Sequence, residues 1–216
     1  MTETGLRMDG IEFMGENVKK RLKSCGVGVV IHPLAKIIYP ESVEIGDYSM
    51  IDDYTFIEGG QGVRIGRFVH IASFCSIVGN GILDMDDFSA LAAGCRIITG
   101  SDDFSGRSLT NPCIPARYKP FLHRGRVTIG KHTVLGTNTI VYPDVAIGPY
   151  SATGAGTVVT RDLGSAGIYM VHRLDAWRIA PRENLSDWNV SCCRSFMASK
   201  DTCCVRQRSA EDRCLA

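Results

Sequence analysis

An aliphatic side chain recurs every six residues between positions 31 and 159, and this repeat limits the possible folds more than any other feature of the chain. Four steps are longer than six residues, and they begin at Ile37, Ile57, Ile77 and Ile97. The first three span eight residues and the last spans thirty-two, and they recur at every third unit. If three hexapeptides form one coil of a three-sided helix, all insertions fall at the same corner. The sequence therefore predicts a parallel β-helix, for which a hexapeptide period is typical.

Small side chains occupy two further positions of the unit. Where the next unit follows after six residues, the residue four places after the aliphatic one is no larger than valine, as at Ser49, Thr55 and Thr133. The residue directly after it is often Gly or Ala, as at Gly46 and Ala72. We expect the aliphatic residues to stack in the core from coil to coil, and the small residues to permit the turns between the short sides.

Two units in particular, Ile45–Met50 and Ile147–Ala152, resemble those of hexapeptide acyltransferases, and the resemblance covers about residues 31–163. It implies an all-β fold, a left-handed parallel β-helix over residues 31–163 with a long loop inserted at 100–126. A cap segment is expected over 1–30 and an irregular tail over 164–216. The resemblance also implies a homotrimer in which the acceptor and acetyl-CoA meet in a cleft between two β-helices.

Charge and composition limit the other possibilities. The 24 basic and 23 acidic residues give a net charge of +1 and no basic stripe for nucleic acid. No apolar run approaches the roughly 18 residues of a membrane span, and the polar start of the chain does not look like a secretory signal, so we expect a cytoplasmic protein. Five of the nine cysteines lie in the last 25 residues, without the spacing of a zinc site. We expect no metal.

The coils after the loop carry the residues that the resemblance assigns to acetyl-CoA, namely Thr137, Ala155, Thr160 and Arg161. Small side chains let the pantetheine arm lie against the backbone, and Arg161 can pair with a phosphate. The same small residues are also ordinary members of the repeat, whereas Thr160 and Arg161 stand where the repeat ends. The segment after Met170 lacks the Gly-Val/Ala-Pro-Ala-Arg pattern with which relatives contact the nucleotide, which puts affinity for CoA in question.

The candidate catalytic residues lie at the loop and one coil before it. Thr99 and Gly100 match the residues that open the loop in galactoside and maltose acetyltransferases, but Ser101 replaces the histidine that acts there as general base. His70 precedes the inward Ile71, so its side chain should point outward.

The segment from Val69 to Ser76 resembles surface-polysaccharide acetyltransferases, which favours His70 as the base. Asp102 and Asp103 are the other candidates. They could bind the acceptor, orient His70 or act as base, although an Asp pair in such a loop can equally form turns.

Three functions are compatible with these patterns. The favoured one is transfer of an acetyl group from acetyl-CoA to a sugar hydroxyl in the biosynthesis of a cell-surface polysaccharide or lipopolysaccharide. The alternative in the same class is N-acetylation of a nucleotide-linked amino sugar, for which a weak base or none would suffice. A metal-dependent β-helix enzyme resembling γ-carbonic anhydrase, or a non-catalytic scaffold, is the third. The metal version needs three converging histidines, and His32, His70, His123 and His132 are poorly spaced for it.

Overall fold

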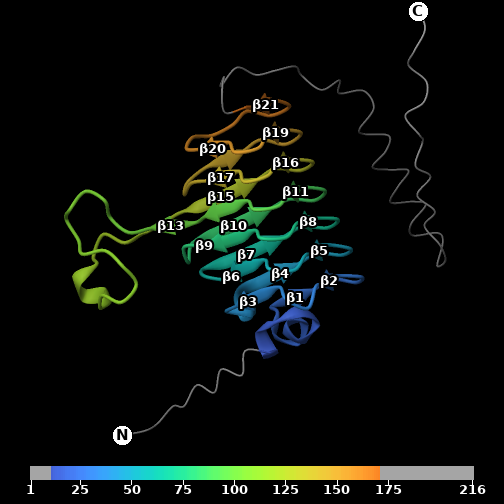
Figure 1. Cartoon of the computed structure of the whole chain (residues 1–216), viewed down its shortest axis with the longest axis horizontal. Coiled ribbons are helices and arrows are strands. Elements are labelled where there is room, and N and C mark those ends of the chain that lie inside the picture. Colours follow the sequence, from blue (N-terminus) through green and yellow to red (C-terminus); the bar gives the residue numbers. More distant parts are fainter. Residues whose placement is uncertain (1–10, 171–216) are drawn as a thin grey trace, which may run out of the picture. The chain divides into compact units, whose positions relative to one another are not determined.

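The computed structural model describes residues 11–170, which form the predicted parallel β-helix (Figure 1). Three parallel sheets make its sides. The first sheet contains β1 (Ser24–Cys25), β4 (Val43–Ile45), β7 (Gly62–Ile65), β10 (Ile82–Met85), β15 (Arg126–Ile129) and β18 (Ala146–Ile147). The second contains β2 (Val30–Ile31), β5 (Met50–Ile51), β8 (His70–Ile71), β11 (Ala90–Leu91), β16 (Val134–Leu135), β19 (Ala152–Thr153) and β21 (Ile168–Tyr169). The third contains β3 (Lys36–Ile38), β6 (Phe56–Glu58), β9 (Ser76–Val78), β12 (Arg96–Ile98), β17 (Ile140–Val141) and β20 (Val158–Val159).

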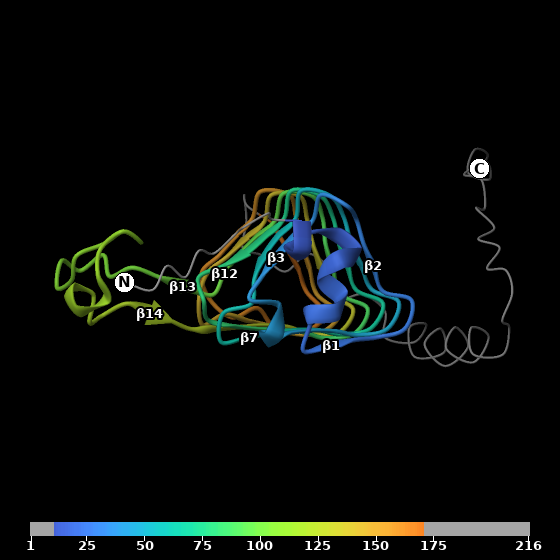
Figure 2. The same cartoon turned by 90° about the horizontal axis from the view of Figure 1, so that it is seen from below.

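The chain visits the first, second and third sheets in turn, so each coil has three corners. The insertions all fall between the third sheet and the first, as the sequence predicted. We call this corner, formed by residues 39–42, 59–61, 79–81, 99–125, 142–145 and 160–162, the loop corner. The long loop leaves it through β13 (Gly100–Ser101) and returns through β14 (His123–Arg124). In Figures 1 and 2 the loop projects on the side away from the second sheet.

The core is a set of aliphatic columns inside the coil. Isoleucines of consecutive coils, such as Ile57 and Ile77, are partners in the strand register and are fully buried. Each buried side chain of this size stabilises the fold by about 1.5–3 kcal/mol relative to its exposed state. The predicted small residues are buried as well, and their hydroxyl groups bond to neighbouring carbonyls, as Ser49 Oγ donates to Gly66 O over 2.8 Å.

The corners differ from the prediction in which residue makes the turn. We expected the small residues to permit it, but the residue in the left-handed region is the larger one three places after the aliphatic residue, such as Tyr48 at φ 56° or Phe68 at φ 55°. The glycines serve a different purpose, because a Cβ on Gly46 would collide with the backbone of Gly66 in the next coil. Small residues are thus needed where coils approach each other closely.

Rings stack on one another at the corner between the first and second sheets. Neighbouring ring centroids are 4.9 to 5.2 Å apart, and the column consists of Tyr48, Phe68, Phe88, His132 and Tyr150. We call this column the aromatic ladder. His132, which the sequence left without a role, is therefore a structural member of the coil.

The N-terminal segment closes the first coil, with short 3₁₀ helices η1 (Ile11–Phe13) and η2 (Gly15–Arg21). Val18 of η2 is fully buried, and Glu16 Oε1 accepts a hydrogen bond from the backbone N–H of Ile31 over 3.0 Å. Further 3₁₀ turns are η3 (Pro40–Ser42) and η4 (Ala116–Tyr118). The parallel strands run beyond the expected limits of 31–163, from β1 to β21. The expected tail after residue 170 lies outside the described residues.

Candidate functional site

The four predicted CoA-binding residues lie at the two edges of the third sheet, near its last strand. Thr137 and Ala155 stand in consecutive turns between the second and third sheets, and Gly156 N donates to Thr137 O over 2.7 Å. Thr160 and Arg161 stand at the loop corner, after β20. All four are exposed. The segment from Ala155 to Thr160 contains the turn at Gly156 and strand β20, so the two pairs of residues lie at opposite ends of this strand.

A small cavity adjoins the second of these edges. It has a volume of about 170 Å³, and Val158, Thr160, Arg161 and Tyr169 are among the residues that line it. A guanidinium beside an open hollow can form two parallel hydrogen bonds with a phosphate. The arrangement at Thr160 and Arg161 therefore provides a place for an anionic group.

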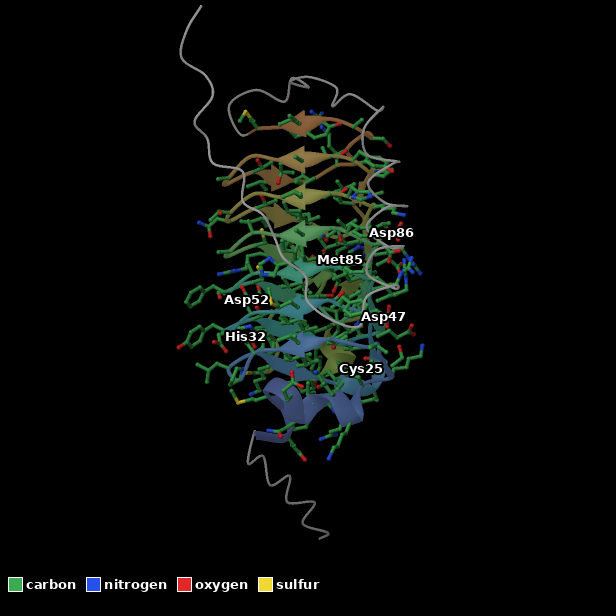
Figure 3. The ribbon with its side chains drawn as sticks, turned by 90° about the vertical axis from the view of Figure 1, so that its right-hand side faces the viewer. Cys25, His32, Asp47, Asp52, Met85 and Asp86 are labelled. Atoms are coloured by element: carbon green, nitrogen blue, oxygen red, sulfur yellow. The ribbon has the colours of Figure 1, made fainter. Side chains whose placement is uncertain are left out.

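His70 lies on the outer face of the second sheet, between Met50 and Ala90 of the neighbouring coils. Its Nε2 is 3.1 Å from Asp52 Oδ2, and its side chain is about half exposed. Asp52 also approaches His32, with 4.0 Å between Oδ1 and Nε2, and Figure 3 shows these two side chains next to each other at one edge of the sheet. The outward orientation predicted for His70 is confirmed.

Asp102 and Asp103 organise the loop from within. The Oδ1 of Asp102 accepts a hydrogen bond from Lys119 Nζ over 2.9 Å, and its Oδ2 accepts one from the backbone N–H of Asn111 over 2.7 Å. The bond from Lys119, followed by the bond from Asn111, holds the pKa of Asp102 below its ordinary value.

Asp103 caps a turn in the same loop. Its two carboxylate oxygens accept hydrogen bonds from the backbone N–H groups of Ser105 and Arg107, over 2.9 and 3.2 Å. Hydrogen bonding from the Ser105 side chain, followed by the backbone bond from Ser105, holds the pKa of Asp103 below its ordinary value. Both carboxylates thus remain ionised and order the loop, and the partner that orients His70 within the chain is Asp52.

The predicted catalytic residues do not converge within one chain. His70 belongs to the second sheet, and the loop with Asp102 and Asp103 leaves the opposite corner (Figures 1 and 2). A site containing all three would need a second copy of the chain.

Sequence reasoning passed over a second histidine–aspartate pair. His123 Nε2 lies 2.6 Å from Asp144 Oδ2 at the base of the loop. The signal was present in the repeat, because Asp144 occupies the turn of the coil directly after the loop returns. Residues at the same corner of adjacent coils lie next to each other.

A larger hollow lies on the first sheet. Its volume is about 430 Å³, and it contains both acidic and basic side chains. Lys23 pairs with Glu44 over 2.6 Å, Arg64 with Asp84 over 3.1 Å, and Arg126 also pairs with Asp84. Because these charges neutralise one another, the hollow does not suit an anionic ligand as the region of Arg161 does.

Two further properties bear on the possible chemistry. Across residues 11–170, no group of three or more His, Cys, Asp or Glu side chains is arranged to hold a metal ion. No helix in this part of the chain has the length and apolar character needed to span a membrane.

Comparison with known proteins agrees with the β-helix fold. Residues 126–161 match the bacterial transferase hexapeptide family (six repeats). The chain is 32% identical over 163 residues to the dTDP-4-amino-4,6-dideoxy-D-glucose acyltransferase of Escherichia coli, an alignment that spans 75% of this chain and 79% of that protein. The chain belongs to the hexapeptide-repeat acyltransferases.

Solved structures extend the comparison. AntD, an N-acyltransferase from Bacillus cereus solved with dTDP and 3-hydroxybutyryl-CoA, superposes with a TM-score of 0.75 at 29% identity, over 84% of this chain and 95% of AntD. A variant of AntD bound to dTDP-4-amino-4,6-dideoxyglucose and coenzyme A gives a TM-score of 0.71 at 30% identity, over 84% and 94%. A maltose O-acetyltransferase from Clostridium difficile, at 17% identity and a TM-score of 0.50 over 77% and 74%, shares the fold alone.

Proposed function

We propose that this acyltransferase moves an acyl group from acyl-CoA to the amino group of a nucleotide-linked amino sugar. The observation that carries the proposal is the similarity to two proteins whose names specify such chemistry, the E. coli acyltransferase and AntD, over most of their lengths. By contrast, the likeness to a sugar O-acetyltransferase is confined to the fold. The preference for a hydroxyl acceptor that the sequence suggested is therefore reversed in favour of its N-acyl alternative.

The residue at the opening of the loop supports an amine acceptor. A sugar hydroxyl is a poor nucleophile and needs a positioned base when it attacks a thioester. A neutral amine already carries a reactive lone pair, so its proton can leave as the carbon–nitrogen bond forms. Ser101, in the place where the O-acetyltransferases have their histidine, fits the less demanding acceptor.

On the donor side, we propose that acyl-CoA lies along the third sheet, with Thr137 and Ala155 at one edge and Thr160 and Arg161 at the other. The small side chains at the first edge would leave the backbone open to the ligand, and Arg161 would bind a phosphate of the nucleotide. Acetyl-CoA remains the predicted donor. A longer acyl chain, such as the 3-hydroxybutyryl group bound by AntD, is the alternative to compare with it.

On the acceptor side, His70, Asp102 and Asp103 remain the proposed residues. Since His70 and the loop lie on opposite sides of one coil, the proposal includes a homotrimer in which the loop of one copy approaches the second sheet of the next. In that arrangement, Asp102 and Asp103 hold the loop in shape and His70 contacts the acceptor. We place the reaction in the cytoplasm.

The test uses two acceptors that differ in a single group. Purified protein is mixed with acetyl-CoA and equal amounts of dTDP-4-amino-4,6-dideoxyglucose and dTDP-6-deoxyglucose, which has a hydroxyl in place of the amine. We expect the acyl group on the amino sugar, as an amide that resists hydroxylamine, with release of one CoA thiol per product. A hydroxylamine-labile ester as the main product would refute the proposal. Repeating the reaction with 3-hydroxybutyryl-CoA assigns the acyl chain.

A further inference from the structure

The base of the long loop is a short antiparallel ladder. Gly100 pairs with Arg124 and Ser101 pairs with His123, and the backbone N–H of Gly125 donates to Thr99 O over 2.7 Å. Directly opposed residues of an antiparallel pair present their side chains on the same face. Strand pairing therefore holds His123 at the base of the loop, next to the coil.

Asp144 fixes the orientation of the His123 ring. Its Oδ2 lies 2.6 Å from His123 Nε2, and its Oδ1 accepts a hydrogen bond from the backbone N–H of Arg126 over 3.1 Å. A Cβ on Gly125 would collide with Oδ1, so the glycine leaves the space that the carboxylate occupies. An ionised carboxylate favours the tautomer in which Nε2 carries the proton. Nδ1 then has a lone pair that can accept a proton.

This pair lies at the same corner as the proposed phosphate site. Asp144 belongs to the turn after β17, and Arg161 belongs to the turn after β20, its partner strand in the next coil. A hydrogen bond links these two parts of the corner. The backbone N–H of Ala146, which directly follows the first turn, donates to Asp162 Oδ1 in the second turn over 2.8 Å. Adjacent coils are spaced at about 4.8 Å. The side chain of His123 is half exposed at this corner.

We propose that His123, positioned by Asp144, is a catalytic residue that accepts a proton from the attacking amine. The nitrogen forms a bond to the thioester carbonyl carbon, the N–H proton passes to Nδ1 of His123, and the carbon–sulfur bond breaks. The imidazolium then returns the proton to the departing thiolate, which leaves as CoA-SH. The products are an amide and free CoA, and His123 ends neutral as it began. This inference rests on the proposed acyl transfer and names the group that moves its proton.

The experiment measures kcat and KM for both substrates in wild type and in His123→Ala and Asp144→Asn. Loss of a general base lowers the rate by about 10² to 10⁴-fold, and the lower figure is expected for an amine. KM for acyl-CoA should stay within about threefold of wild type, because the variants leave Thr160 and Arg161 in place. Added imidazole should restore part of the kcat of His123→Ala, which a purely structural role would not allow.

Two matched variants control for a change at the base of the loop and for the loss of a histidine. Arg124→Ala changes the neighbouring residue on β14, and His132→Phe removes a histidine while keeping a ring in the aromatic ladder. Both should keep wild-type kcat. A kcat of His123→Ala within about threefold of wild type overturns the inference. It is also overturned if imidazole fails to rescue and Arg124→Ala shows the same loss.

The outcome also separates this inference from the proposed acceptor. If the wild-type enzyme acylates the hydroxyl acceptor and not the amine, the proposed function is wrong, and the same variants then test His123 in ester formation. If amide forms at the wild-type rate in His123→Ala, the proposed function stands and the role of His123 is rejected.

Discussion

In the described part of the chain, two hydrogen-bonded histidine–aspartate pairs have the same chemistry in different surroundings. His70 lies on the second sheet, between Met50 and Ala90, and its Nε2 is 3.1 Å from Oδ2 of Asp52, the residue directly after β5. His123 and Asp144 lie at the loop corner, 2.6 Å apart, one coil before the turn that contains Thr160 and Arg161. A regular sheet can align two side chains but encloses nothing around them. The irregular corner adds a loop, a cavity and a basic residue to the same pair, so the two pairs should differ in function.

The largest expected effect comes from removing the contact between His123 and Asp144, the loop-corner pair. Asp144→Asn should lower kcat by about a hundredfold, because an amide no longer selects the tautomer with a free Nδ1. The KM for acyl-CoA should change little. Steady-state kinetics with each substrate varied in turn would check this, and a loss confined to acyl-CoA binding would show that Asp144 serves the donor site instead.

Substitutions in the other pair, His70 and Asp52, should have a different kinetic effect. His70→Gln is expected to raise the KM for the acceptor about tenfold, with kcat within about threefold of wild type, as for a residue that binds substrate without transferring its proton. Asp52→Asn should have a similar but weaker effect, since it only reorients His70. If His70→Gln instead removes kcat and His123→Ala does not, the roles of the two pairs are exchanged.

The basic residue beside the loop-corner pair can be tested on its own. Arg161→Glu should weaken acyl-CoA binding about tenfold or more, because it replaces a phosphate partner with a like charge. Lys20→Glu, the same change of charge on an exposed residue of η2 at the other end of the coil, is the matched control. Calorimetric titration with acetyl-CoA measures both. Equal affinities in the two variants would remove Arg161 from the donor site.

The loop that carries His123 depends on Asp102. Asp102→Asn should speed hydrogen exchange in residues 102–119, because the Lys119 ammonium loses its charged partner. The pKa of this carboxyl is lowered in the folded state, so its stabilising effect is complete above the ordinary Asp pKa of about 3.9 and is lost as pH falls through the lowered value. Loop protection, corrected for intrinsic exchange, should therefore be constant from about pH 8 to pH 5. A loss of protection in that range would contradict the contact.

The smallest effect is expected far from both pairs, in the aromatic ladder. His132→Ala removes two ring contacts and should lower the free energy of unfolding by about 1–3 kcal/mol, at 0.5–1.5 kcal/mol for each contact, while kcat stays unchanged. His132→Phe should restore the stability. Chemical denaturation of the three proteins measures this, and a variant as stable as wild type would show that the ladder adds nothing.

The comparison also explains what the sequence could and could not predict. The coil, its core and the insertion corner follow from a strict period, in which Ile57 and Ile77 must become neighbours. The aromatic turns were missed because Tyr48 and Phe68 adopt a positive φ that their residue types rarely favour, and stacking between coils compensates for it.

The site was less predictable from the sequence, because its contacts join residues within the loop or residues of the loop and a later coil. His70 was placed outward correctly from the repeat. The partners of Asp102 inside the loop, Lys119 and Asn111, follow no repeat and emerge only from the loop conformation. His123 and Asp144 are separated by 21 residues, and only the return of the loop to the same corner brings them together.

The central claim, transfer to an amine, is tested most directly by the ratio of kcat/KM for dTDP-4-amino-4,6-dideoxyglucose to that for dTDP-6-deoxyglucose, measured with acetyl-CoA at saturation. The two acceptors differ only in the group that attacks the thioester. We predict a ratio of at least about a hundred, since a sugar hydroxyl is a much weaker nucleophile than a neutral amine. A ratio near or below one would contradict the account and return the hydroxyl acceptor to first place.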